Sequence, residues 1–195
     1  MKVKICGITS IEDACLCDDL GADALGFVHV PGRMRTLPLV RIREICSSIG
    51  PMSVKVLVCA PDDVASARDM FDAAGVDVLQ LHSLGPEELS ELRSEGIRVI
   101  RSVPPVRQEA ERYAHSADAL LFEGGSPGTG SSYDYSEVPL DVCGRGIIAG
   151  GLTPSNLHEA KALGPYALDV SSGVEAVPGR KDPSLVEEFV RRCRS

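Results

Sequence analysis

Short apolar runs, many of them β-branched, alternate along the chain with longer amphipathic stretches, and polar or Gly/Pro breaks separate the two. Continuous apolar runs of this kind are typical of strands buried on both faces of a parallel sheet. The strands predicted in this way are 3–5, 24–28, 54–58, 76–81, 97–100, 119–122, 146–149 and 167–170. The amphipathic stretches predict helices at 11–20, 39–49, 64–74, 86–94, 107–115, 154–163 and 183–192, while 131–142 gives the weakest helix signal.

Eight strand-then-helix units follow one another without a linker or a shift in composition, which predicts a single domain over residues 1–195. Right-handed connections between parallel strands leave two main solutions, an open doubly wound sheet or a closed barrel. A doubly wound sheet that binds a dinucleotide would carry GxGxxG after its first strand, where this chain has Cys6-Gly7-Ile8-Thr9. Units of about 24 residues suit the barrel, so we predict an α/β fold, a short (β/α)8 TIM barrel.

Composition narrows the function classes. Apolar residues make up 44% of the chain and charged residues 25%, as in ordinary globular proteins, and no apolar run approaches the roughly 20 residues that span a bilayer. A net charge of −8, 4% aromatic residues and no Trp argue against nucleic acid as a partner. Seven cysteines without a CxxC pair or a secretory signal predict free thiols and a cytoplasmic protein. The four histidines are scattered, so no metal site is expected.

Candidate chemistry gathers where the predicted strands end, which is the active-site end of a parallel barrel. Those ends read Cys6-Gly7, His29, Cys59, His82, Ser102, Glu123, Gly150-Gly151 and Ser171-Ser172-Gly173. The last two loops predict a phosphate site, because glycines let backbone N–H groups approach an anion and a short helix after strand eight would add its positive end. The alternative is that these glycines only form tight turns.

Cys6 is the candidate base. A free Cys is usually a small buried packing residue, as Cys15, Cys17, Cys46 and Cys193 on helices are expected to be. Cys6, however, ends a strand beside Gly7, and Lys4 lies on the same strand face, where a cation favours the thiolate. By the same alternation Asp169 faces inward on strand eight, next to strand one, so we predict a Lys4–Asp169 ion pair across the seam of the barrel.

These residues carry a family resemblance. Lys4-Ile5-Cys6-Gly7-Ile8-Thr9 resembles the opening KICGIT signature of the phosphoribosylanthranilate isomerase family of tryptophan biosynthesis. The likeness continues, in order and over nearly the whole chain, through Gly26-Phe27-Val28, Arg35, Gln80-Leu81-His82, Gly128-Thr129-Gly130, Ile148-Ala149-Gly150-Gly151-Leu152, Asp169-Val170-Ser171-Ser172-Gly173-Val174-Glu175, Gly179 and Lys181-Asp182.

The resemblance implies an Amadori rearrangement of N-(5-phosphoribosyl)anthranilate to 1-(2-carboxyphenylamino)-1-deoxyribulose 5-phosphate. In this family the furanose opens under general-acid catalysis and a base removes the proton at C2; the match puts that base at Cys6. Arg35 would contact the anthranilate carboxylate, and His82 and Asp169 would contact the substrate. Phosphate would lie at Gly150, Gly151, Ser171, Ser172 and Gly173. No cofactor is implied, because the proton returns to the same molecule.

The general acid departs from the family pattern. The family usually has Asp at the end of strand six in an LLD run, and the run here is Leu120-Leu121-Phe122-Glu123. Glu123 therefore stands at the acid position, on an arm one methylene longer. Asp118 has the opposite strand parity, and Asp134 lies beyond the loop and matches a downstream FDW-type motif, so neither is preferred.

Two alternative functions and two structural questions stay open at this point. A related isomerase of histidine biosynthesis, or a bifunctional barrel, typically uses two Asp residues and has a longer two-fold repeat. A non-catalytic sensor of a phosphorylated ligand would bind a product analogue without turnover. The sequence also leaves the assembly open between monomer and homodimer, and His29 between a pocket residue and a loop histidine.

Overall fold

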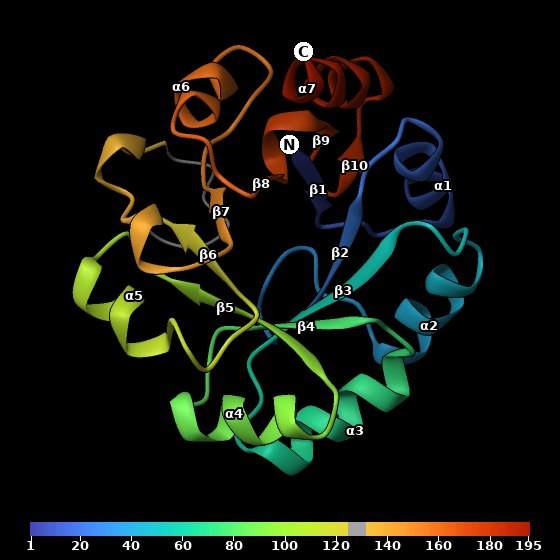
Figure 1. The fold of residues 1–195 in the computed structure, drawn as a ribbon. Helices are drawn as coiled ribbons and strands as arrows, with labels where there is room; N and C mark the ends of the chain where they lie inside the picture. The colour runs from blue at the N-terminus through green and yellow to red at the C-terminus, as the bar shows by residue number, and fades with distance from the viewer. Residues whose placement is uncertain (125–131) are drawn as a thin grey trace.

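Eight parallel strands close into a barrel in the computed structural model, which describes residues 1–124 and 132–195 (Figure 1). The strands are β1 Lys2–Cys6, β2 Ala24–His29, β3 Val54–Cys59, β4 Val78–Leu81, β5 Arg98–Val103, β6 Ala119–Glu123, β7 Gly146–Ala149 and β8 Ala167–Val170. The helices around them are α1 Ile11–Asp19, α2 Leu39–Ser47, α3 Val64–Ala74, α4 Pro86–Ser94, α5 Arg107–Tyr113, α6 Leu157–Ala162 and α7 Pro183–Arg194. The predicted TIM barrel is confirmed, strand by strand.

The weak helix signal at 131–142 does not correspond to an α-helix in the described residues. The described part of this segment holds two short 3-10 turns, η1 Tyr135–Glu137 and η2 Leu140–Val142, and no α-helix. Pro139, which has no N–H to donate, separates the two turns, and Asp134 caps η1 through the N–H of Ser136. The Gly128-Thr129-Gly130 motif lies outside the described residues.

The core has two layers because alternate strand residues point to opposite faces. The outer layer, between strands and helices, holds the large side chains, Phe27, Phe122 and Phe189 among them. The interior of the barrel is filled by smaller groups, with Ile100 packed against Ala119, Leu121, Ile147, Ala149 and Ala167. Polar residues on the same inward face therefore come together at one end of the barrel.

The two ends of the chain meet at the seam of the barrel. β1 pairs with β8 in a register that sets Lys4 opposite Asp169. After β8 the chain forms a 3-10 turn, η3 Ser172–Val174, and a small antiparallel hairpin of β9 Glu175–Val177 and β10 Arg180–Lys181. This hairpin leads into α7 and lies beside β1 (Figure 1). Thr9, in the loop after β1, donates to the carbonyl oxygen of Gly179 between the hairpin strands at 2.5 Å.

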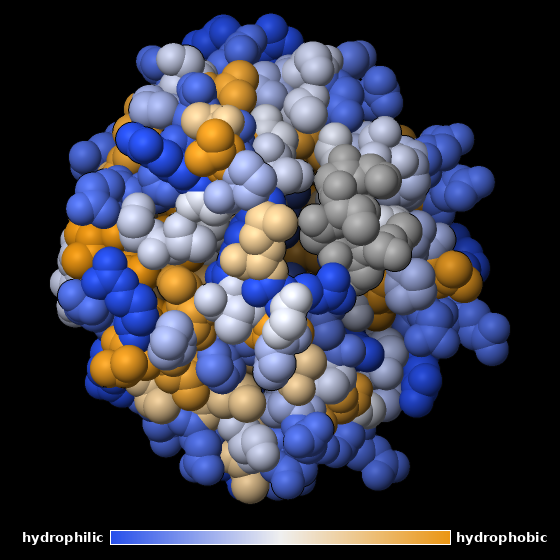
Figure 2. All heavy atoms as spheres, turned by 180° about the vertical axis from the view of Figure 1, so that it is seen from behind, coloured by the Kyte–Doolittle hydropathy of each residue, from blue (hydrophilic) through white to orange (hydrophobic). Residues whose placement is uncertain are grey.

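The outer surface mixes polar and apolar groups. Figure 2 shows the face opposite to that of Figure 1, where apolar side chains lie in groups among polar ones and the surface is hollowed near its centre. No helix in the described part of the chain is long and apolar enough to cross a membrane.

Candidate active site

A buried ion pair holds the inner end of the site. Lys4 Nζ donates to Asp169 Oδ1 at 2.8 Å, and the two side chains are only 3% and 9% exposed. The predicted pair across the seam is thus confirmed. An ammonium and a carboxylate this deeply buried are each costly alone, so the register of β1 on β8 lets each charge compensate the other.

Cys6 follows Lys4 by two residues on the same face of β1, and the positive charge of Lys4 acts on its thiol. Gly26 on β2 makes room for both, because a Cβ there would lie 2.8 Å from Cys6 Sγ and 3.1 Å from Lys4 Nζ. Burial raises the pKa of the Cys6 thiol above its usual value, although Lys4 pulls that pKa down. Lys4 does favour the thiolate, as expected, but the effect of burial on the Cys6 pKa is larger than the effect of Lys4.

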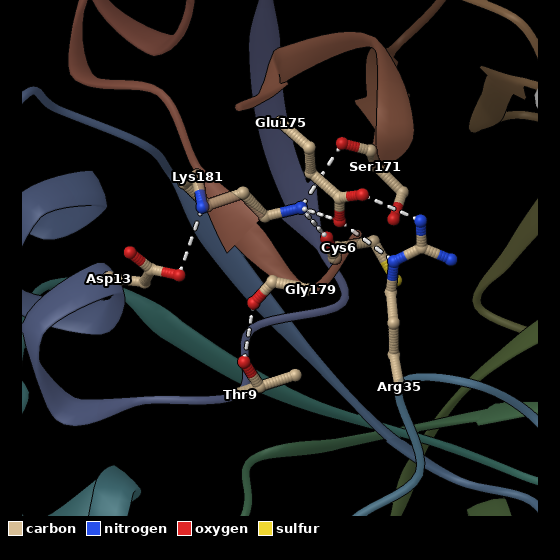
Figure 3. A network of polar contacts seen from close by, with 8 residues as sticks. All are labelled: Cys6, Thr9, Asp13, Arg35, Ser171, Glu175, Gly179 and Lys181. Carbon is tan, nitrogen blue, oxygen red and sulfur yellow. Dashed lines mark hydrogen bonds and ion pairs between the residues drawn. The ribbon is translucent and has the colours of Figure 1, made fainter. Parts of the chain in front are cut away.

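A second network of charges lies over Cys6 and joins three loops (Figure 3). Lys181 Nζ donates to the carbonyl oxygens of Cys6 at 2.7 Å and Ser171 at 3.1 Å, and to Glu175 Oε1 at 3.0 Å. Glu175 also receives two bonds from Arg35, from Nε at 2.7 Å and from Nη2 at 2.6 Å. Burial disfavours the Glu175 carboxylate, but Arg35 and Lys181 outweigh it and hold the pKa of Glu175 below its usual value.

The two glycine loops are adjacent, as the sequence predicts. Gly150 and Gly151 follow β7 with φ of +91° and +65°. Gly173 lies in η3, where a methyl group would overlap the carbonyl oxygen of Leu152, so only glycine lets the loops after β7 and β8 come this close. The expected short helix after β8 is this 3-10 turn. The loops place several backbone N–H groups at the same end of the barrel as Cys6.

Glu123 ends β6 on the inward parity of Ala119 and Leu121, and it is partly buried. The two other acids lie elsewhere. Asp118, at the opposite end of β6, accepts from the backbone N–H of Val99 at 2.8 Å and from Arg93 at 3.1 Å. Asp134 is exposed, and its bonds to Ser136 lower the pKa of its carboxyl. Of the three, Glu123 alone ends a barrel strand at the active-site end.

His82 lies just past the end of β4, and its Nε2 is 3.3 Å from the hydroxyl oxygen of Ser102 on β5. The same hydroxyl oxygen accepts a hydrogen bond from Gln80 Nε2 at 3.3 Å. Burial, together with the positive charges of Arg101 and Lys4, lowers the pKa of His82 to about 4. The ring is therefore neutral at physiological pH and can donate or accept a hydrogen bond without carrying charge. His29 instead anchors the loop after β2, with Nδ1 2.8 Å from the carbonyl oxygen of Leu37.

This geometry agrees with comparisons to known proteins. A model of the N-(5'phosphoribosyl)anthranilate (PRA) isomerase family matches residues 3–192. The chain belongs to this family. It carries the family's activity, the isomerization of N-(5'-phosphoribosyl)anthranilate in tryptophan biosynthesis.

Individual members of the isomerase family match from end to end. The N-(5'-phosphoribosyl)anthranilate isomerase of Rubrobacter xylanophilus is 39% identical, and the match covers 100% of this chain and 99% of the relative. The crystal structure of the Thermus thermophilus isomerase is 40% identical with a TM-score of 0.92, covering 100% and 98% of the two chains. An isomerase in complex with reduced 1-(o-carboxyphenylamino)-1-deoxyribulose 5-phosphate is 31% identical with a TM-score of 0.88, over the same coverage.

Sequence reasoning missed the role of Lys181 and Glu175 in this isomerase. Both appear in its motifs, but the pattern gives no sign that their side chains meet Arg35 and the backbone of Cys6. The roles of Gly26 and Arg101 were missed as well; Arg101 donates to the carbonyl oxygens of Leu81 and Ser83 on either side of His82. The described residues contain no group of three or more His, Cys, Asp or Glu side chains that could hold a metal ion.

Proposed function

We propose that this isomerase carries out the Amadori rearrangement with Cys6 as general base and Glu123 as general acid. The product would be 1-(2-carboxyphenylamino)-1-deoxyribulose 5-phosphate. Glu123 donates a proton to the ring oxygen of the furanose, which opens to a protonated imine. Cys6 then removes the proton at C2, and the enolamine that results tautomerises to the ketone. One proton leaves C2 and one is returned, so no oxidant or cofactor takes part.

The observation that carries this proposal is the position of Cys6 beside Lys4, whose ammonium forms the buried pair with Asp169. An ordinary packing cysteine has apolar neighbours; the Cys6 thiol instead shares the space beside Gly26 with the Lys4 ammonium, whose charge lowers its pKa. The cationic imine formed on ring opening adds a second positive charge near the thiol, which favours the thiolate when the substrate is bound. Proton removal is thereby coupled to the preceding acid step.

The remaining groups hold the substrate at its two ends. Backbone N–H groups of Gly150, Gly151 and Gly173, with those of Ser171 and Ser172, bind the phosphate in the two glycine loops. Arg35 binds the anthranilate carboxylate. Neutral His82 and the inward Asp169 provide polar contacts to the ribose. A substrate anchored at both ends keeps its C2 within reach of Cys6.

Steady-state turnover tests these assignments, followed as loss of anthranilate fluorescence. We expect Cys6→Ser and Glu123→Gln each to lower kcat by about 10²–10⁴-fold, the usual contribution of a general base or acid. Cys15→Ser on α1 and Glu137→Gln in η1 change the same residue types away from the site and should retain wild-type kcat. If Glu123→Gln were near normal, the acid would lie elsewhere and Asp134 would be tested next.

The cellular setting extends the same proposal. Free thiols and a biosynthetic substrate suit a cytoplasmic enzyme that works on a small phosphoribosyl compound. A relative from Thermotoga maritima is described as a dimer from which monomers were generated, so both states occur among structural neighbours. Sedimentation of the purified chain separates monomer from homodimer.

A further inference from the structure

Arg35 is held in place by the carboxylate of Glu175. Its Nε and Nη2 both donate to Glu175, at 2.7 and 2.6 Å, in the two-pronged geometry that fixes a guanidinium plane. The side chain of Arg35 is 13% exposed, and that of Glu175 is 4% exposed. The stem of Arg35 also packs against Gly7, next to Cys6 in the chain. A long, flexible side chain thus has one orientation over the site.

The pairing with Glu175 uses only one edge of the guanidinium. Arginine has five N–H donors, and Glu175 takes two of them. Nη1 and the second hydrogen of Nη2 form the other edge, for which the described residues provide no hydrogen-bond acceptor. Figure 3 shows Arg35 turned so that this edge points away from Glu175. An aromatic carboxylate can bind there in the same two-pronged way while Glu175 keeps its place.

Glu175 is the counterion of Lys181 as well as of Arg35, so its single negative charge does not fully neutralise Arg35. The ammonium of Lys181 is fully buried, and its other two acceptors are uncharged carbonyl oxygens, so Glu175 is its counterion. Asp13 accepts from the backbone N–H of Lys181, at 3.0 Å, rather than from its ammonium (Figure 3). One carboxylate therefore faces two cations, and this leaves positive charge on Arg35 for an incoming anion. The same ammonium fixes the backbone of Cys6.

We propose that Glu175 is a positioning residue that presents the free edge of Arg35 to the anthranilate carboxylate, with Lys181 tying this recognition to the backbone of Cys6. The inference rests on the proposed function and adds to it the group that determines selectivity for a carboxylate-bearing aryl amine. Glu175 touches no substrate. It fixes the direction in which Arg35 points and lowers the entropy that Arg35 loses on binding.

The test compares two probes, reduced 1-(o-carboxyphenylamino)-1-deoxyribulose 5-phosphate and the same compound made from aniline, which lacks the carboxylate. In the wild type we expect the carboxylate to tighten binding by about tenfold or more, as for a hydrogen bond to a charged group. In Glu175→Gln this preference falls by about tenfold, while the aniline compound binds as to the wild type. With the natural substrate KM rises about tenfold and kcat changes less than about threefold. Glu187→Gln, an exposed position on α7, is the matched control and keeps every value.

Arg35→Met separates this inference from the proposed function. If Arg35→Met loses the carboxylate preference and Glu175→Gln keeps it, Arg35 binds the carboxylate without help and the positioning role is overturned. If neither variant changes the preference, the assignment of Arg35 itself fails. The double variant Arg35→Met/Glu175→Gln should be no worse than Arg35→Met, because Glu175 acts through Arg35. Should Glu175→Gln fail to fold, Glu175→Gln/Lys181→Met, which removes the fully buried Lys181 charge that would lose its counterion, carries the comparison of the binding of the two probes.

Discussion

At the scale of single residues, each buried charge of the active site is compensated by a neighbouring charge of opposite sign. Lys4 and Asp169 illustrate this, since each is almost without solvent and each has the other within 2.8 Å. Burial disfavours the Lys4 ammonium, yet Asp169 and the Cys6 thiol outweigh it and raise the pKa of Lys4 above its usual value. Burial raises the pKa of the Asp169 carboxyl above its usual value, although Lys4 and Lys181 pull that pKa down, so the carboxylate depends on its neighbouring cations.

Breaking this pair should destabilise the protein strongly. Lys4→Met leaves the Asp169 carboxylate buried and unpaired, which costs about 3–5 kcal/mol. Urea unfolding at pH 7 measures the loss. The double variant Lys4→Met/Asp169→Leu removes both charges and should recover most of the stability, while remaining inactive. Equal stability of the single and double variants would contradict this account.

The lowered pKa of His82 makes the free energy of unfolding depend on pH. Its pKa is about 4 in the folded protein against a reference value of 6.5, so the unfolded chain binds a proton first as the pH falls. The stabilisation due to neutral His82 is complete above pH 6.5 and is lost between there and about pH 4, by about 3 kcal/mol. We expect His82→Asn to flatten the pH dependence of the unfolding free energy in this window. His158→Asn, at an exposed site on α6, should leave the dependence unchanged.

At the scale of elements, local signals placed most of the helices. α7 begins where Asp182 accepts from the N–H groups of Ser184 and Leu185, at 2.9 and 3.1 Å, with Pro183 in the first turn. Its apolar side packs on the barrel through Val186, Phe189, Val190 and Cys193. The described residues 132–142 lack such a combination of cap, uninterrupted N–H donors and apolar stripe, and they contain two 3-10 turns.

Removing the N-terminal cap of α7 should lower the stability of the whole protein. Asp182→Ala leaves two N–H groups without their acceptor and should cost about 1 kcal/mol, whereas Asp182→Asn keeps an acceptor and should cost less. Thermal unfolding compares the two variants. An unchanged midpoint in Asp182→Ala would mean that water replaces the carboxylate without cost.

At the scale of the whole molecule, the site is built from both ends of the chain. Cys6 and Lys4 come from β1, Asp169 from β8, and Lys181 from the hairpin that follows β8. A ligand that engages these loops binds the closed barrel and not the unfolded chain. Its binding energy therefore stabilises every element at once.

Ligand linkage provides the corresponding measurement. With the reduced product analogue at 100 times its dissociation constant, the unfolding free energy should rise by about 2.7 kcal/mol. At the same analogue concentration the increase in unfolding free energy should be smaller in Gly173→Ala, because the new methyl group pushes apart the loops after β7 and β8 and weakens binding. A full increase in Gly173→Ala would argue against a phosphate site in these loops.

Sequence alone determined the order of elements, the parallel barrel, and the residues at its strand ends, Cys6 and Glu123 among them. It could do so because alternation and helical periodicity are local, and because closing eight parallel units sends all strand ends to one face. Even the Lys4–Asp169 pair followed, from strand parity plus closure. Tertiary structure decided the rest. Arg35 and Glu175 lie 140 positions apart, and no local pattern predicts that they meet. The pKa of Cys6 likewise depends on how much water the folded chain excludes, which only the packed structure sets.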